Sequence, residues 1–155
     1  MNEVLKAIRT RRTIRRFKPD PVKDENLRTI LDAGRWAPSF SNLQPWRFIV
    51  IRDTEIKSAL DKAARESVLH LGINEAPVVI LVCVDRRIDP LHSIEAGAAA
   101  TQNMALAAQS LGLNTSWIGV YDVKNVYLFM SGEWQLRTAL TGGVNDSAVP
   151  SFTVH

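Results

Sequence analysis

The chain has 155 residues and a net charge of +3, with 46% apolar and 23% charged side chains. This length and composition are typical of one soluble globular domain and exclude fibrous and intrinsically disordered chains. The charge is uneven, because residues 1–18 hold seven of the 19 basic side chains and one of the 16 acidic ones, a local charge of +6. That excess predicts an anion-binding segment near the N-terminus, while the remaining 12 basic and 15 acidic side chains exclude a uniformly basic surface.

Neither a disulfide nor a membrane span is expected. Cys83 is the only cysteine and lies in an apolar run, which predicts a buried thiol without a disulfide partner in the chain. Polar side chains, Glu95 and Gln102 among them, interrupt the Ala-rich stretch 94–111, so it is not expected to cross a membrane. The N-terminus lacks the apolar stretch of a signal peptide. These features predict a cytoplasmic protein.

Helix and strand patterns alternate along the chain without a linker. A short helix is predicted over 2–10, and extended chain follows as far as Pro19 and Pro21. Apolar spacing of i, i+3, i+4, i+7 predicts a helix from about 24 to 36, capped by Asp24 or a neighbour. This alternation predicts helices that cover a sheet. The remaining predicted elements are helices at 54–71, 94–111 and 123–130 and strands at 46–51, 78–84, 115–121 and 136–141.

The first motif concentrates guanidinium groups beside a hydroxyl. A guanidinium stays charged at physiological pH, and its fork of N–H donors matches phosphate oxygens. In extended chain Arg11, Thr13 and Arg15 share one face, with Arg12 and Arg16 on the other. The first face can hold a phosphate and a second anionic group together. A solvated basic turn is the simpler interpretation of such a cluster. Nucleic-acid binding is a third, although no nucleic-acid motif or aromatic platform accompanies the charge.

The second motif is a loop of turn-forming residues that ends at a tryptophan. Pro38, Ser39, Ser41 and Asn42 favour a turn, and Trp46 begins a predicted strand. Taken alone, this loop is a simple connection between a helix and a strand.

Four stretches in the same order and spacing resemble the FMN-dependent nitroreductase family. They cover roughly residues 1–123 of the chain. They are Arg11-Arg12-Thr13-Ile14-Arg15-Arg16-Phe17; Ala37-Pro38-Ser39 followed by Asn42-Leu43-Gln44-Pro45-Trp46; Glu95-Ala96-Gly97-Ala98-Ala99-Ala100-Thr101-Gln102-Asn103; and Leu111-Gly112-Leu113 continuing to Trp117-Ile118-Gly119.

The resemblance implies a fold, a cofactor and a reaction. The implied fold is a three-layer α/β/α sandwich of the α+β class with a central, mostly antiparallel sheet, formed by residues 1–155 as one domain. The implied assembly is a homodimer with FMN at its interface and the helix at 94–111 in the dimer contact. NADH or NADPH would reduce the flavin, and a nitroaromatic, quinone or related small acceptor would then be reduced in ping-pong order.

The same resemblance implies the residues of the cofactor site. Arg11 and Thr13 resemble contacts to the FMN phosphate and ribityl chain, with Arg12 contributing through its main chain. Arg15 resembles the basic residue beside N1 and O2 of the flavin ring, and Phe40 a residue near the ring and the substrate. Pro38, Ser39 and Asn42 resemble a loop that reaches the flavin from the other subunit. Trp117, Ile118 and Gly119 resemble a strand end near N5.

No catalytic side chain and no metal site are expected. The flavin carries the hydride chemistry, and solvent can deliver the second proton. The three histidines, His70, His92 and His155, do not stand at metal-ligand spacing. Neither nucleic acid nor a membrane is expected as a partner.

The C-terminal part, residues 124–155, diverges from the family. The family carries Arg and Lys near its C-terminus that hold the FMN phosphate, whereas the last Arg here is Arg137 and the last Lys is Lys124. The loss of such cations leaves an alternative open beside the oxidoreductase. In it, the protein is a flavin- or anion-binding homodimer with little turnover, a pseudoenzyme or regulatory module.

Overall fold

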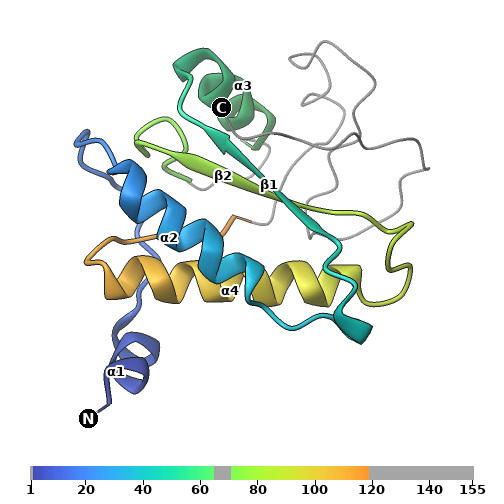
Figure 1. Cartoon of the computed structure of the whole chain (residues 1–155). Helices are drawn as coiled ribbons and strands as arrows, with labels where there is room; N and C mark the ends of the chain where they lie inside the picture. The colour runs from blue at the N-terminus through green and yellow to red at the C-terminus, as the bar shows by residue number, and fades with distance from the viewer. Residues whose placement is uncertain (1, 65–70, 119–155) are drawn as a thin grey trace.

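The computed structural model describes residues 2–64 and 71–118 (Figure 1). Their elements, in chain order, are α1 (Glu3–Thr10), α2 (Asp24–Arg35), the 3-10 turn η1 (Phe40–Asn42), β1 (Trp46–Ile51), α3 (Thr54–Ala64), β2 (Val79–Val84) and α4 (Ser93–Ser110).

Five predicted elements are confirmed to within one residue at each end: 2–10, 24–36, 46–51, 78–84 and 94–111. The helix predicted over 54–71 is confirmed as far as Ala64. Of the strand predicted over 115–121, only residues 115–118 are described, and there Thr115 forms an isolated bridge. The helix predicted at 123–130 and the strand at 136–141 lie outside the described residues.

The two strands form an antiparallel pair between two layers of helices. Their register runs from Trp46 opposite Val84 to Ile51 opposite Val79. Figure 1 shows α2 and α4 on one side of the pair and α3 on the other. This is the layering expected for the α+β sandwich.

Alternation along the strands supplies both layers with apolar side chains, as a period of two requires. Ile49, Ile51, Leu81 and Cys83 join the core cluster that contains Leu60 of α3. Phe48, Ile80 and Val82 join the cluster formed by Ile30 of α2 and by Met104 and Ala108 of α4.

Small residues let α2 and α4 lie close together. Ala100 and Ala108 are almost completely buried. A Cβ atom on Gly34 of α2 would lie 2.9 Å from both Met104 Cγ and Phe48 Cζ. The absence of a side chain at Gly34 therefore sets the close approach of α2, α4 and β1.

The side-chain cap predicted for the start of α2 is not made. Lys23 occupies the N-cap position, and in the described chain no side chain caps it. Asp24 instead forms an ion pair with Arg52, the residue that directly follows β1. The hydrogen bond and the charge of that guanidinium lower the pKa of Asp24 below its ordinary value. Pairing with Arg52 therefore replaces capping here, and the prediction was wrong.

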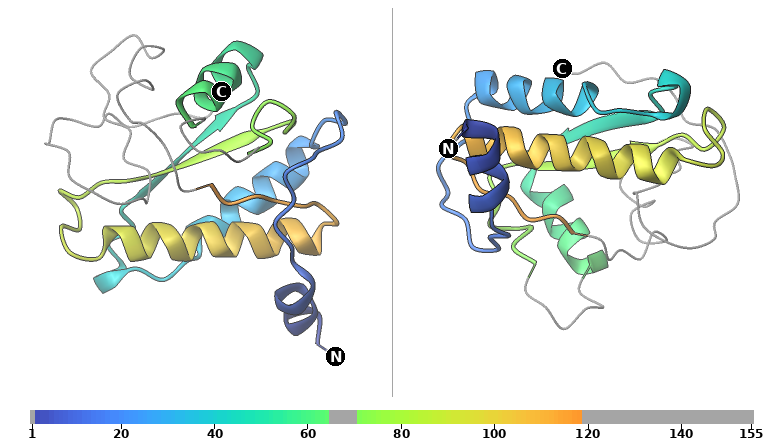
Figure 2. Two further views of the ribbon diagram at one scale, coloured as in Figure 1. Left: turned by 180° about the vertical axis from the view of Figure 1, so that it is seen from behind. Right: turned by 90° about the horizontal axis from the view of Figure 1, so that it is seen from below.

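Helix α1 stands apart from the rest of the molecule, near the C-terminal end of α4 (Figures 1 and 2). It begins with a cap, because the Asn2 side chain accepts a hydrogen bond from the Val4 N–H at 2.8 Å. Its apolar residues Val4, Leu5 and Ile8 are 63%, 50% and 52% exposed. The described chain thus leaves the apolar face of α1 uncovered.

Among residues 2–64 and 71–118, no helix combines the length and the apolar character that a membrane span needs.

Candidate cofactor site

The arginine motif runs beside the segment that follows α4. The N–H of Ile14 donates to the carbonyl of Thr115 at 3.0 Å, and Thr13 and Thr115 form a parallel bridge. Two regions separated by about a hundred residues are thereby joined, and both carry predicted site residues. The first region contributes Arg11, Arg12, Thr13 and Arg15, and the second contributes Trp117 and Ile118, whereas Gly119 lies outside the described residues.

The predicted cofactor face carries cations without carboxylate partners. Arg11 is half-buried and Arg15 is exposed, and among the described residues neither forms an ion pair. The Arg12 side chain folds back, and its Nη1 donates to the carbonyls of Arg9 and Arg11 at 2.8 and 2.9 Å. Two guanidinium groups without a described carboxylate partner, two residues before and two residues after Thr13, offer donors of the kind that binds a phosphate. The residues present therefore fit the phosphate end of FMN.

A glycine that sequence analysis did not single out supports this face. A Cβ on Gly72 would lie 2.1 Å from the carbonyl oxygen of Arg15, and Gly72 has a φ of +77°. Only glycine combines that conformation with so close an approach. In the sequence, Gly72 is recognisable only as a glycine between a predicted helix and a predicted strand, and no pattern connects it to Arg15.

Helix α3 holds the turn that begins at Gly72. The buried Lys57 donates from Nζ to the carbonyl of Ala76 at 3.0 Å. Asn74 donates from Nδ2 to Oδ2 of the buried Asp61, also at 3.0 Å. Two side chains of α3 thus fix the turn that supports the Arg15 backbone.

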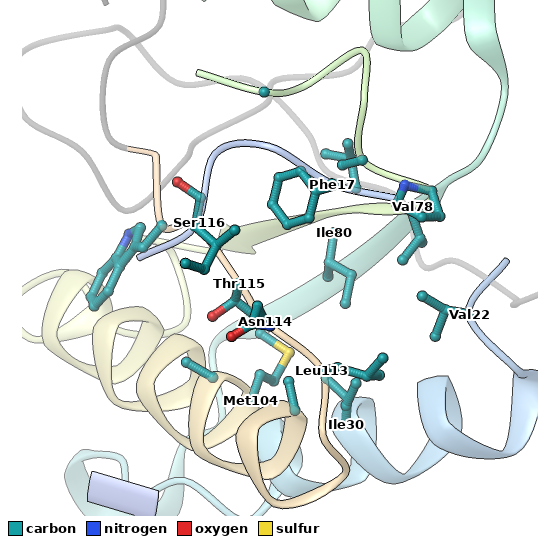
Figure 3. Close-up of a pocket in the computed structure, with 18 of the residues that line it drawn as sticks. Phe17, Val22, Ile30, Val78, Ile80, Met104, Leu113, Asn114, Thr115 and Ser116 are labelled. Atoms are coloured by element: carbon teal, nitrogen blue, oxygen red, sulfur yellow. The ribbon is translucent and has the colours of Figure 1, made fainter. Parts of the chain in front are cut away.

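A cavity of about 550 Å³ lies between β2 and the segment 113–118 (Figure 3). Arg16 lines it, whereas Arg11, Thr13 and Arg15 are not among the described residues that do. Its mainly apolar walls suit the phosphate of FMN less well than does the predicted cofactor face of Arg11, Thr13 and Arg15, called the arginine face below. The walls include Phe17, Ile30, Val78, Ile80, Met104 and Leu113, with Asn114, Thr115 and Ser116 along one side (Figure 3).

The second predicted group occupies a tightly constrained loop. Ser41, Asn42 and Gln44 have φ angles of 46°, 57° and 49°, in the left-handed region that non-glycine residues rarely adopt. The Ser39 Oγ accepts a hydrogen bond from the Gln44 N–H at 2.9 Å. The Asn42 Oδ1 accepts another from Gln44 Nε2 at 3.2 Å. Such strain persists where surrounding contacts enforce it, and it is frequent at binding sites.

The two groups lie at opposite ends of α4. Gln109, near the C-terminal end of this helix, donates to Thr10 beside the arginine motif. At the other end, Phe40 of the loop stacks on His92, which directly precedes α4. The 18 residues of α4 span about 27 Å at the usual helical rise. In Figures 1 and 2, the segment after α1 lies near one end of α4 and the turn before β1 lies near the other. Within one chain, the predicted site residues therefore form two separate groups.

Possible metal ligands and Cys83 can also be located in the described part. No cluster of three His, Cys, Asp or Glu side chains suited to a metal occurs among residues 2–64 and 71–118. Cys83 is buried as predicted, and its burial raises the pKa of the thiol to about 12. It therefore remains a protonated core residue at neutral pH.

Comparison with known proteins identifies the family. The model of the nitroreductase family matches residues 8–74 and 69–143. The chain belongs to the nitroreductase family. A candidate NADH dehydrogenase/NAD(P)H nitroreductase of Methanothermobacter thermautotrophicus is 38% identical over 125 residues, which cover 79% of this chain and 64% of that protein. A similarly named protein of Archaeoglobus fulgidus is 39% identical over 124 residues, covering 78% and 70%.

Solved structures agree with this nitroreductase assignment. A candidate nitroreductase from Desulfovibrio desulfuricans, solved in complex with FMN, is 44% identical with a TM-score of 0.71. The match covers 77% of this chain and 70% of that one. The described α+β layers are therefore those of the nitroreductase fold. The chain spans about two thirds of the length of the curated relatives named above.

Proposed function

We propose that the protein is an FMN-dependent NAD(P)H oxidoreductase of the nitroreductase type. The observation that carries this proposal is the arginine face of Arg11, Thr13 and Arg15, on a stretch of chain that pairs through Thr13 and Ile14 with Thr115 after α4. Its unneutralised guanidinium groups suit the phosphate of a flavin nucleotide. Membership of the nitroreductase family and the FMN complex of the Desulfovibrio relative support the choice of cofactor.

In this proposal, each described site residue has a distinct role. Arg11 and Thr13 bind the phosphate and the ribityl chain, and the main chain of Arg12 lies beside them. Arg15 supplies a fixed positive charge near N1 and O2 of the flavin ring. Because flavin reduction increases negative charge there, Arg15 favours the reduced state and raises the reduction potential. The segment containing Trp117 and Ile118 orients the ring near N5.

The protein residues bind and orient, while bound FMN supplies hydride transfer. NADH or NADPH serves as donor, and a small nitroaromatic, quinone or related compound serves as acceptor over the same ring face. Phe40 is 58% exposed at the tip of the strained loop and is the residue assigned to the acceptor. No side-chain acid or base is required, since solvent can deliver the proton. A cytoplasmic location suits a reaction driven by NAD(P)H.

We further propose a homodimer in which each flavin lies between two chains. The loop with Pro38, Ser39 and Asn42 lies about one helix length from the arginine face of its own chain, so it would complete the site of the partner. The exposed apolar face of α1 supports such an assembly. So does α4, on which the small side chains of Ala98, Ala99 and Ala107 are only partly buried within this chain.

A specific feature supports the alternative of a homodimer with little turnover. The chain has no Arg after Arg137 and no Lys after Lys124, so residues 138–155 offer the phosphate no cation. Each lost charge-assisted contact costs about 1.5–3 kcal/mol. The proposed domain would still comprise residues 1–155, and the loss of these contacts would weaken its binding of FMN.

The experiment that separates these functions begins with the absorbance spectrum of the purified protein. FMN is then added and the affinity measured by quenching of flavin fluorescence. We expect a dissociation constant of about micromolar or below, and steady oxidation of NADH or NADPH with a quinone or nitroaromatic acceptor. Flavin binding without turnover would favour the alternative, and a colourless protein that does not bind added FMN would exclude the oxidoreductase and the flavin-binding form of the alternative.

A further inference from the structure

Phe40 is held by an aromatic partner from a different part of the chain. Its ring stacks on that of His92, with centroids 4.7 Å apart and an angle of 30° between the planes. Phe40 is 58% exposed, and the stack on His92 is a contact that can fix the orientation of its ring. A stacked contact of this kind favours one orientation of the two rings.

His92 is itself fixed by a buried carboxylate. Asp89 is 2% exposed, and its Oδ1 accepts hydrogen bonds from the N–H groups of Leu91 and His92 at 3.2 and 2.8 Å. The same oxygen lies 3.6 Å from the His92 Nδ1. Because Asp89 accepts hydrogen bonds from the backbone at Leu91 and His92, it fixes the position of His92 just before α4.

The turn that carries Asp89 and His92 is also bonded to the other end of the loop. The N–H of Asp85 donates to the Pro45 carbonyl at 2.8 Å, and the N–H of Asp89 donates to the Asp85 carbonyl at 3.3 Å. The Arg87 side chain donates two hydrogen bonds and its backbone N–H a third to the Asp85 carboxylate, and they lower the pKa of Asp85 below the ordinary value. The loop is therefore attached to this turn at Pro45 and at Phe40.

We propose that His92 is a positioning residue, which sets the place of Phe40 over the acceptor and holds the strained loop in its binding conformation. This inference rests on the proposed function for its effect on the acceptor. The geometric part, that His92 holds the loop, stands on the described contacts alone. His92 touches neither substrate nor cofactor in this proposal and acts through Phe40.

Hydrogen exchange of the loop tests the geometric part. The amides of Asn42, Leu43 and Gln44 all bond within the loop, at 3.1, 3.0 and 2.9 Å, and report on its closure. Loss of the stack in His92→Ala should speed their exchange about two- to tenfold. His92→Phe, which keeps an aromatic ring, should restore the slow exchange. Leu91→Ala is the matched control, because that neighbouring side chain is 79% exposed.

Steady-state kinetics tests the effect on the acceptor. His92→Ala should raise the KM for the acceptor by up to the same factor, and it should weaken FMN binding by no more than that factor, because the loop that His92 holds also carries Ser39 and Asn42. Phe40→Ala should speed the exchange of the Asn42, Leu43 and Gln44 amides by the same factor. The double variant His92→Ala with Phe40→Ala should speed it no further than either single variant.

The two proposals fail separately. If wild-type protein binds no FMN while His92→Ala still loosens the loop, the proposed function is wrong and the positioning role stands. If the wild type is an active flavoenzyme and His92→Ala changes neither loop exchange nor KM, the positioning role is wrong. Should His92→Ala not fold, His92→Phe and Phe40→Ala decide the matter: unchanged loop exchange in Phe40→Ala refutes the role.

Discussion

Arg11 and Arg16 belong to one basic segment but meet different surroundings. Arg16 lines the apolar cavity beside β2, whereas Arg11 does not. This difference arises because successive side chains of extended chain point to opposite sides. A comparison of the two arginines therefore separates a specific phosphate contact from a general effect of positive charge.

Arg11→Ala should weaken FMN binding by about ten- to hundredfold, because it removes one charge-assisted contact to the phosphate. Arg16→Ala removes the same charge from the cavity side and should change the affinity by less than about threefold. Flavin fluorescence titration at one ionic strength measures both. Equal losses in the two variants would indicate nonspecific attraction, and undiminished affinity in Arg11→Ala would refute its assignment.

Cys83 illustrates a residue whose chemistry is set by burial. Desolvation raises the pKa of its thiol to about 12, so the reactive thiolate is nearly absent at pH 8. We expect the Cys83 thiol of native protein to react slowly with a disulfide reagent at pH 8. In urea-unfolded protein, one thiol per chain should react rapidly. Rapid reaction of the native protein would show that the β2 layer opens readily or that the thiol is accessible.

At the scale of elements, the turn after α3 links helix packing to the cofactor face. Gly72→Ala would place a methyl group against the Arg15 carbonyl, and its positive φ adds a further penalty. We expect lower thermal stability and weaker FMN binding, because the backbone at Arg15 must move. Gly112→Ala is a matched control, since Gly112 has a φ of +73° but open space around its Cβ position.

The control variant should lose about 1 kcal/mol of stability from the left-handed conformation alone and keep its FMN affinity. Thermal unfolding and flavin titration of the two variants give the comparison. If both glycine variants bind FMN equally well, Gly72 does not support the site.

The bounds of the described helices and strands followed well from the hydrophobic pattern, because most of these elements pack apolar side chains into the core. The period of 3.6 placed Leu27 and Ile30 of α2 correctly, and the run rich in Phe, Ile and Val placed β1. The start of α2 did not follow, since Asp24 pairs with Arg52 across space. No local pattern reports a contact between residues 28 positions apart.

The site was predictable only where motifs are local. The alternation of residues 11–16 indicated two faces, and the turn formers at 38–42 indicated a loop. The left-handed conformation of Ser41, Asn42 and Gln44 gave no signal, because glycine usually marks that region and none occurs here. The approach of Gly72 to Arg15 and the stack of Phe40 on His92 depend on tertiary packing, which a single sequence does not encode locally.

On the scale of the whole molecule, the distance between the arginine face and the loop is the decisive feature. One chain holds both groups but places them at opposite ends of α4. Two chains related by a twofold axis would each contribute one group to each site. The exposed apolar face of α1 gives such a dimer surface to bury.

This arrangement predicts complementation between two inactive variants. One carries Arg11→Ala, and the other carries Ser39→Ala with Asn42→Ala. In a mixed dimer, one site combines both defects and the other contains only wild-type residues. Random reassortment makes half the dimers mixed, so about a quarter of wild-type sites are restored.

Subunit exchange between these two variants, followed by FMN titration and NAD(P)H oxidation, tests the shared site most directly. Our account predicts that each variant alone is nearly inactive and that the exchanged mixture regains about a quarter of the wild-type activity and flavin sites. A mixture that, after verified exchange, remains as inactive as its components would show that one chain forms each site alone.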